Sequence, residues 1–180
     1  MIEENLLIHE LKNSQTQDKA FRELMSMYKE RLYWHIRKIV ISHDDADDVL
    51  QNTFIKVYRS IHNFKAESKL YSWMYRIATN EAISFINKRA KEQKIDVFEI
   101  QHQLVNNLQA DVYFDGNEVQ IKLQKAIALL PQKQQLVFNM KYFDDMKYKE
   151  ISEILETSIG ALKASYHHAV KKIETALKET

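Results

Sequence analysis

The sequence predicts an all-α fold made of two small helical domains. The 180 residues include only two glycines and one proline, too few for the turns that many strands would require. Apolar residues recur at steps of three and four along most of the chain, which is the spacing of amphipathic helices. With 45% hydrophobic and 28% charged residues, the composition is typical of a globular protein rather than a disordered one.

The first domain is assigned to residues 1–92. Its second helix carries apolar side chains along one face, from Phe21 to Ile39. Its third helix begins with acidic residues, which the helix dipole favours in a first turn. The expected helices span about 3–12, 18–40, 44–61 and 70–91.

Residues 93–117 are assigned to a flexible acidic linker and residues 118–180 to a second domain. The stretch 92–118 has six acidic residues against one lysine, a net charge of −5. Near the C-terminus, two helices are separated by a three-residue break in which Ser158 is placed to cap the second helix. This arrangement predicts a helix-turn-helix. The expected helices span about 117–130, 131–143, 148–155 and 158–177.

Several classes of protein are disfavoured. The chain has no cysteine, which excludes disulfides and thiolate zinc sites and fits a reducing compartment. No apolar run approaches the roughly 18 residues of a membrane span, and the N-terminus lacks the features of a signal peptide. We therefore expect a cytoplasmic protein. Since no P-loop, nucleophile elbow or paired nucleophile and base is found, neither catalysis nor a cofactor is predicted.

An acidic cluster opens the third helix. Its members are Asp44, Asp45, Asp47 and Asp48, next to His43. Such a cluster is compatible with a divalent metal site, as in a metal-dependent nuclease. Because no second set of ligands lies nearby in the sequence, we favour helix N-terminal charge or a docking surface.

Aromatic and basic residues are interleaved in the segment from Phe64 to Phe85. Residues 56–91 carry eight Lys and Arg against two Glu, a net charge of +6. Planar rings and cations suit unstacked bases and phosphates of single-stranded DNA. The same helical spacing is typical of core packing, which we favour for Trp73 and Tyr75. The residues concerned are Tyr71, Trp73 and Tyr75 with Lys65, Lys69 and Arg76.

The last helix has a polar face suited to a major groove and its phosphates. Its opposite face is apolar and is expected to be buried. His167 and His168 are a weak metal pair, because adjacent helical residues diverge by about 100°. The polar face comprises Lys163, Ala164, His167, His168, Lys171 and Lys172.

In this order, the motifs resemble those of bacterial sigma factors of the extracytoplasmic-function (ECF) type, in the sigma-70 family. The first half resembles sigma region 2 through Asp44–Phe54 (DDADDVLQNTF) and Trp73–Asn80 (WMYRIATN). The second half resembles region 4 through Leu130-Pro131, Tyr148–Ile151 (YKEI) and Gly160–Lys163 (GALK). The resemblance covers nearly the whole chain and implies a factor that binds core RNA polymerase and directs promoter recognition and DNA melting.

The resemblance also implies which residues contact each partner. The expected surface for core polymerase comprises Asp47, Asp48, Gln51 and Phe54. The expected contacts to the minus-ten element, including a flipped base, are Asn63, Phe64, Lys65, Lys69, Trp73, Arg76, Asn80, Lys88 and Arg89. The expected contacts to the minus-thirty-five element are Ser158, Gly160, Lys163, Ala164, His167, His168, Lys171 and Lys172. Promoter DNA and core polymerase are the implied partners, and an anti-sigma factor is a candidate regulator.

The chain departs from the family pattern at three positions. Ser152 replaces a common alanine, Glu156 replaces a turn glycine, and Ala161 replaces a threonine, which removes a hydroxyl. Glu156 must then adopt a backbone conformation that glycine takes more easily. Two alternatives stay open at this point: a stand-alone helix-turn-helix regulator that binds operator DNA without polymerase, and the small metal-dependent nuclease.

Overall fold

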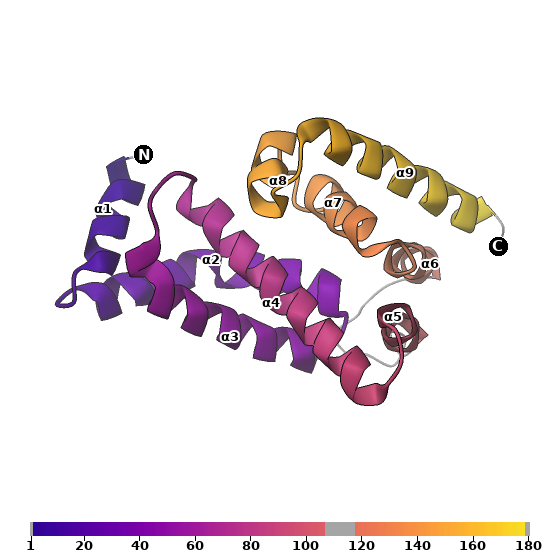
Figure 1. The fold of residues 1–180 in the computed structure, drawn as a ribbon, viewed down its shortest axis with the longest axis horizontal. Coiled ribbons are helices and arrows are strands. Elements are labelled where there is room, and N and C mark those ends of the chain that lie inside the picture. Colours follow the sequence, from indigo (N-terminus) through magenta and orange to yellow (C-terminus); the bar gives the residue numbers. More distant parts are fainter. Residues whose placement is uncertain (1, 107–117, 179–180) are drawn as a thin grey trace.

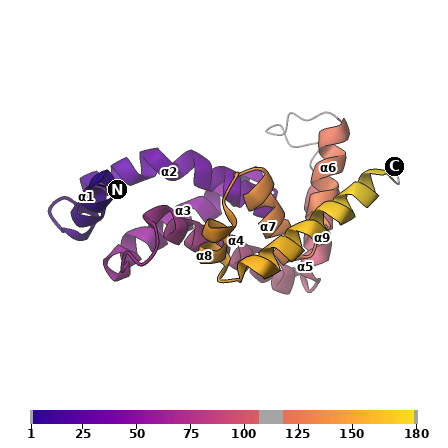
Figure 2. The same cartoon turned by 90° about the horizontal axis from the view of Figure 1, so that it is seen from above.

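The computed structural model describes residues 2–106 and 118–178. Within these ranges all regular secondary structure is α-helix or 3₁₀-helix, and there is no strand, which confirms the all-α prediction (Figures 1 and 2). None of the helices in these ranges combines the length and apolar character needed to cross a membrane. The elements are α1 (Ile2–Lys12), α2 (Gln17–Val40), α3 (His43–Ser60), η1 (Ile61–Asn63), α4 (Leu70–Gln93), α5 (Val97–Asn106), α6 (Glu118–Ala128), α7 (Gln132–Tyr142), α8 (Tyr148–Leu155) and α9 (Ile159–Lys178).

The N-terminal half is a bundle in which α2, α3 and α4 pack against one another. Each helix contributes fully buried apolar side chains, among them Leu32, Val57 and Met74. The short helix α1 lies across one end of the bundle (Figure 1). Ser42 caps α3, because its hydroxyl accepts a hydrogen bond from the backbone N–H of Asp45 at 3.4 Å. The predicted order and approximate bounds of these four helices are confirmed.

In the C-terminal half, α6, α7 and α8 pack against α9. The helices α8 and α9 form the predicted helix-turn-helix. Glu156 lies in its turn at φ 50° and ψ 43°, the left-handed conformation expected of this position. Ser158 accepts a hydrogen bond from the backbone N–H of Ala161 at 3.3 Å, so it caps α9 as predicted.

Part of the predicted linker is a packed helix. The sequence predicts a flexible linker without a helix over residues 93–117, yet α5 forms there, and Ile100 and Val105 are 1% and 4% exposed. The physical reason is that Val97, Ile100 and Leu104 recur at three- and four-residue steps, which gives α5 an apolar face toward α4 and α6. The remainder of the linker, residues 107–117, lies outside the described residues.

The two halves pack directly against each other. Helix α8 contacts α4, and α7 contacts α2 (Figures 1 and 2). Buried residues of the N-terminal bundle form one continuous apolar cluster with residues of α7 and α8, such as Val137, Met140 and Ile151. This arrangement determines which surfaces of each half are accessible.

Candidate functional site

A groove runs between α2 and α3 on the N-terminal bundle. It has a volume of about 740 Å³, and its walls are largely apolar with charged residues at the edges. Three of the four residues predicted to dock on a partner, Asp47, Gln51 and Phe54, line it. Asp48 is exposed on the same helix. The other lining residues are Phe21, Met25, Lys29, Leu50, Ile55, Tyr58 and Arg59.

Phe54 is less exposed than a side chain on a docking surface would be. It is 4% exposed and packs edge to face with Phe21, with ring centroids 6.1 Å apart. Its ring therefore forms the floor of the groove and belongs to the core. The apolar side chain that the groove offers to a partner is Ile55, which is 48% exposed. Ile55 was not among the predicted residues, although its spacing of four residues from Gln51 is a signal that could have placed it on the same face.

The acidic cluster at the start of α3 makes local ion pairs. Asp45 binds Nη1 of Arg89 on α4 at 2.5 Å, and Asp47 lies 3.6 Å from Nε2 of His43. Within residues 2–106 and 118–178, no three His, Cys, Asp or Glu side chains converge to hold a metal ion. Arg89, one of the predicted minus-ten contacts, thus joins α4 to α3, and its guanidinium is engaged in the bundle.

Most residues predicted to contact the minus-ten element lie on α4 or in the segment before it. Lys69, Trp73, Arg76 and Asn80 follow one another at steps of three and four, so they share one face of the helix. Trp73 and Arg76 are partly buried. The exposed members of the predicted set are Asn63, Lys65, Lys69, Asn80 and Lys88.

The aromatic residues of this region divide between core and surface. Phe64 is 3% exposed and packs on Trp73, with ring centroids 5.1 Å apart, so its ring lies in the core although it was expected to contact DNA. Tyr75 is 1% exposed, which confirms the predicted core role. Burial and the nearby charge of Asp144 raise the pKa of Tyr75. Of the two aromatic residues in the predicted minus-ten set, Trp73 is therefore the one that stays partly exposed.

Helix α8 packs on the part of α4 that carries Arg76, whereas Lys69, just before α4, stays exposed beside it. Nη1 of Arg76 donates a hydrogen bond to Oε1 of Glu156 at 2.9 Å, and Nη2 donates to the backbone carbonyl of Glu153. Nζ of Lys69 lies 3.5 Å from Oε1 of Glu150. The backbone N–H of Lys147 holds the pKa of Glu150 below its ordinary value, and the Lys69 ammonium adds to this effect. Sequence reasoning missed these pairs.

Asp144, in the turn before α8, binds two basic side chains of α2. Its carboxylate accepts a hydrogen bond from Nζ of Lys38 and lies 3.5 Å from Nδ1 of His35. Nε2 of His35 is 2.8 Å from the hydroxyl of Thr79, which in turn donates to the carbonyl of Tyr75. Burial raises the pKa of Asp144, but the hydrogen bond and charge of His35 and the charge of Lys38 together lower it below its ordinary value.

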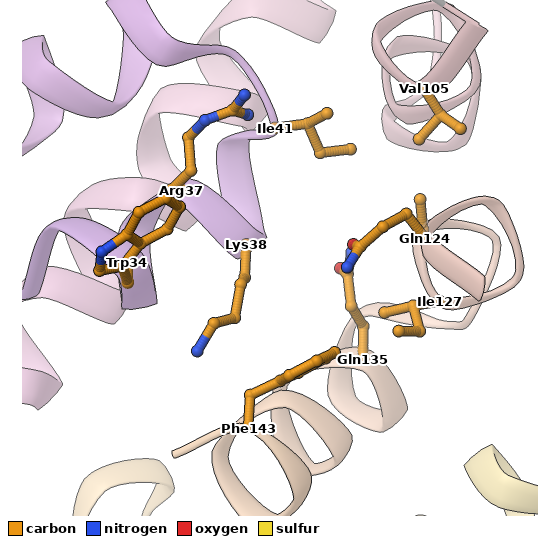
Figure 3. Close-up of a pocket in the computed structure, with 10 residues that line it drawn as sticks. Trp34, Arg37, Lys38, Ile41, Val105, Gln124, Ile127, Gln135 and Phe143 are labelled. Carbon is orange, nitrogen blue, oxygen red and sulfur yellow. The ribbon is translucent and has the colours of Figure 1, made fainter. Parts of the chain in front are cut away.

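A cavity of about 150 Å³ lies where the two halves meet (Figure 3). Trp34 and Lys38 of α2 line one side, and Gln135 and Phe143 of the C-terminal half line the other (Figure 3). Gln135 is buried, and its Nε2 has no hydrogen-bond partner among the described residues. The contact between the halves therefore combines a continuous apolar cluster with this cavity beside it.

Helix α9 presents the predicted polar face to solvent. Leu162, Ala169 and Ile173 are buried on the opposite face, as predicted. Gly160 is exposed, and the space around its Cα is open. The Lys163 ammonium lies 5.9 Å from the centre of the Tyr148 ring. The exposed members of the predicted set are Ser158, Gly160, Lys163, Ala164, His167, His168, Lys171 and Lys172.

Comparison with known protein families identifies the family of this chain. Residues 24–92 match the Sigma-70 region 2 family, and residues 120–173 match the Sigma-70 region 4 family. The first match contains most of the groove and of α4, and the second contains α8 and most of α9. The chain belongs to the sigma-70 family.

Curated relatives place this sigma factor in the ECF class. It is 28% identical to the ECF RNA polymerase sigma factor SigW of Bacillus subtilis (strain 168) over 169 residues, 89% of this chain and 90% of the relative. It is 29% identical to the ECF RNA polymerase sigma-E factor of Haemophilus influenzae over 168 residues, 89% of this chain and 88% of the relative. As an ECF sigma factor, the protein binds core RNA polymerase and directs promoter recognition, and the stand-alone regulator is not favoured.

Two solved structures share the fold. The sigma factor RpoE in complex with the anti-sigma factor NepR from Bartonella quintana has a TM-score of 0.68 at 21% identity, and the match covers 89% of this chain and 98% of that one. CnrH in complex with the cytosolic domain of CnrY has a TM-score of 0.70 at 17% identity, covering 98% of this chain and 97% of that one.

Proposed function

We propose that this sigma factor uses three separate surfaces for its three contacts in transcription initiation. The observation that carries the proposal is that the three predicted residue sets fall on three chemically different surfaces. These are the apolar groove between α2 and α3, the basic face of α4, and the exposed polar face of α9.

The groove between α2 and α3 is the docking surface for core polymerase. Asp48 and Gln51 are exposed beside it, Asp47 lines its edge and Phe54 forms its floor. Exposed Ile55 supplies an apolar anchor within this polar rim, the combination that favours a specific protein interface.

The face of α4 and the segment before it bind the minus-ten element. Lys65, Lys69 and Arg76 supply charge for phosphates, and the exposed amides of Asn63 and Asn80 supply donors and acceptors for a base. Trp73 offers a ring on which a base can stack. Phe64 supports this ring from beneath, and Lys88 extends the positive surface along α4.

The exposed face of α9 binds the minus-thirty-five element in the major groove. Lys163, Ala164 and His167 lie near the start of the helix, where base edges come within reach, and His168 continues the face. Lys171 and Lys172 lie farther along and are placed for phosphates. Ser158 and Gly160 position the start of the helix.

Two further assignments accompany this proposal. The protein acts in the cytoplasm, where ECF sigma factors work with polymerase. An anti-sigma factor is its regulatory partner, which is supported by the sigma factor RpoE of similar fold that is bound to the anti-sigma factor NepR.

The minus-ten assignment is tested with holoenzyme assembled from core polymerase and the full chain. A fluorescent single-stranded oligonucleotide from the non-template strand is titrated with holoenzyme carrying the wild-type factor, Asn80→Ala or Lys69→Ala. We expect Asn80→Ala to lower discrimination between promoter and scrambled strands, and Lys69→Ala to lower the affinity for both. Equal binding of both strands by the wild type would contradict the assignment.

A further inference from the structure

Helix α1 contacts both ends of the segment that joins η1 to α4. This segment, residues 64–69, is here called the minus-ten loop, because it contains three of the proposed minus-ten residues: Phe64, Lys65 and Lys69. At its first residue, Nζ of Lys12 donates a hydrogen bond to the carbonyl oxygen of Phe64 at 2.5 Å. Directly after its last residue, the backbone N–H of Leu70 donates to Oε1 of Glu4 at 2.8 Å.

We propose that Glu4 and Lys12 are positioning residues, which hold the minus-ten loop and the start of α4 in the conformation that reads the non-template strand. The proposal rests on the proposed minus-ten site. It goes beyond that site because it assigns a role to α1, which the proposed function leaves without one. Helix α1 also precedes residues 24–92, the part of the chain that matches the region 2 family.

Glu4 caps α4 from a different helix. The N-cap residue of α4 is Lys69, whose side chain makes no capping hydrogen bond, and the first turn of α4 has no acidic residue. The carboxylate of Glu4 therefore supplies both the acceptor and the negative charge that a helix N-terminus favours. Because Trp73 follows Leu70 by less than one turn of α4, an ordered start of this helix also orders the proposed stacking ring.

Lys12 acts at the other end of the loop, on the residue that supports Trp73. Its ammonium lies 6.0 Å from the centre of the Phe64 ring and also binds the carbonyl oxygen of Phe64. The Phe64 ring in turn packs on Trp73. A hydrogen bond from a charged donor is stronger than one between neutral groups. Lys12 thus fixes Phe64, and through it the ring on which a base can stack.

The loop between these two contacts depends on support from its ends. Lys65, Ala66 and Glu67 are exposed, so their side chains add little packing. Ala66 has φ 56°, a left-handed conformation that costs free energy in a residue with a Cβ atom. Helix α1 is itself firmly held, because Leu7 and Leu11 are buried in the core of the bundle.

The variants that test the proposal are Glu4→Ala and Lys12→Met in the full chain. Methionine keeps an unbranched apolar side chain and removes the donor. The matched controls are Glu10→Ala on α1 and Lys19→Met on α2, which change the net charge by the same amounts. Glu4→Gln and Lys12→Arg are the conservative variants, since each keeps a group that can make the same hydrogen bond. Circular dichroism and urea denaturation establish that every variant is folded.

Two quantities are measured. The first is amide hydrogen exchange of residues 64–70 in the free factor, which reports local opening of the loop. The second is the affinity of holoenzyme for the fluorescent non-template strand and for its scrambled counterpart. We expect Glu4→Ala and Lys12→Met each to speed this exchange and to lower the ratio of promoter to scrambled affinity by about 3- to 10-fold, the effect of losing one hydrogen bond.

The controls and the conservative variants should match the wild type in both measurements. A purely structural role for Glu4 and Lys12 would lower stability in urea but leave the affinity ratio unchanged. The affinity ratio therefore separates positioning of the loop from support of the fold.

Three results would overturn the proposal. Unchanged exchange of residues 64–70 would show that α1 does not hold the loop. Faster exchange with an unchanged affinity ratio would show that the held conformation is not needed to read DNA. Equal loss of affinity for both strands in Lys12→Met, with a weaker salt dependence, would show that Lys12 binds a phosphate itself.

Holoenzyme with Asn80→Ala separates these failures from failure of the proposed minus-ten site. If Asn80→Ala loses discrimination between the two strands, the site stands and only the role of α1 is wrong. If Asn80→Ala discriminates as well as the wild type, the site itself is wrong.

Discussion

Arg76 of α4 and Glu156, the residue directly after α8, are joined by a hydrogen bond of 2.9 Å, although 80 positions separate them in the sequence. Glu156 lies in the turn of the helix-turn-helix and takes a left-handed backbone conformation at φ 50°, which glycine adopts more easily. An ordinary residue in this conformation costs roughly 1 to 2 kcal/mol. The residue in this unfavourable backbone conformation is therefore also the one whose side chain binds the guanidinium of Arg76 in the other half.

The first prediction separates the floor of the polymerase groove from its surface. Ile55→Ser should weaken core binding about tenfold while the helical circular dichroism signal stays unchanged, because Ile55 is 48% exposed. Leu6→Ser on α1, at 59% exposure, is the matched control and should bind core normally. Equal core affinity of the two variants in a pull-down titration would refute the docking assignment.

Phe54→Ala should act differently, because its ring is buried against Phe21. We expect it to lower the free energy of unfolding by about 3 to 5 kcal/mol, as for a large aromatic side chain removed from a core. Urea denaturation measures this loss. A variant as stable as the wild type would show that the ring is free for a partner after all.

Arg89 should contribute to the bundle more than to DNA binding. Its ion pair with Asp45 joins α3 to α4, and both side chains are partly buried, at 33% and 17% exposure. A double-mutant cycle with Arg89→Ala and Asp45→Ala should give a coupling of about 0.5 to 1 kcal/mol in unfolding free energy. If the coupling free energy is zero and holoenzyme with Arg89→Ala binds DNA more weakly, Arg89 is instead a contact to the minus-ten element.

The Asp144 contact should be sensitive to acid. Because the pKa of Asp144 is lowered in the folded protein, its contribution is complete above the unfolded value of about 3.9 and is lost as the pH falls through the lowered value. Asp144→Asn should cost about 1 to 3 kcal/mol between pH 5 and 8. In urea titrations the difference from the wild type should shrink below about pH 4; a difference that grows there would contradict the contact.

The sequence predicts local features of this fold well and long-range features poorly. Periodicity and capping residues suffice for α2, α3 and α9, because these features depend on neighbours within one or two turns. Burial of Phe54 and Phe64 depends on which helix lies opposite, and the spacing of a single helix does not contain that information. Pairs such as Arg76 with Glu156 require the packing of α8 on α4, which no local pattern shows. The helix α5 was missed because its polar neighbours hid a short apolar face.

On α9, position along the helix should decide what each lysine does. Lys163→Ala, near the helix start, should change the preferred base at one step of the minus-thirty-five element and cost roughly 1 to 3 kcal/mol there. Lys172→Ala should weaken all promoters about equally and flatten the salt dependence. Selection from a library randomised over this element checks both expectations. If Lys163→Ala and His167→Ala both leave the preferred sequence unchanged, this face of α9 does not read the minus-thirty-five element.

Promoter-specific transcription with purified core polymerase tests the central claim most directly. Each template has two randomised windows at a fixed separation, followed by a constant transcribed region. The templates that give transcripts are then sequenced. The account predicts transcripts only when the factor is added, with one preferred sequence in each window, and loss of the minus-ten preference in Asn80→Ala. Binding of the factor alone to duplex DNA with the same preference, and no factor-dependent transcripts, would contradict it.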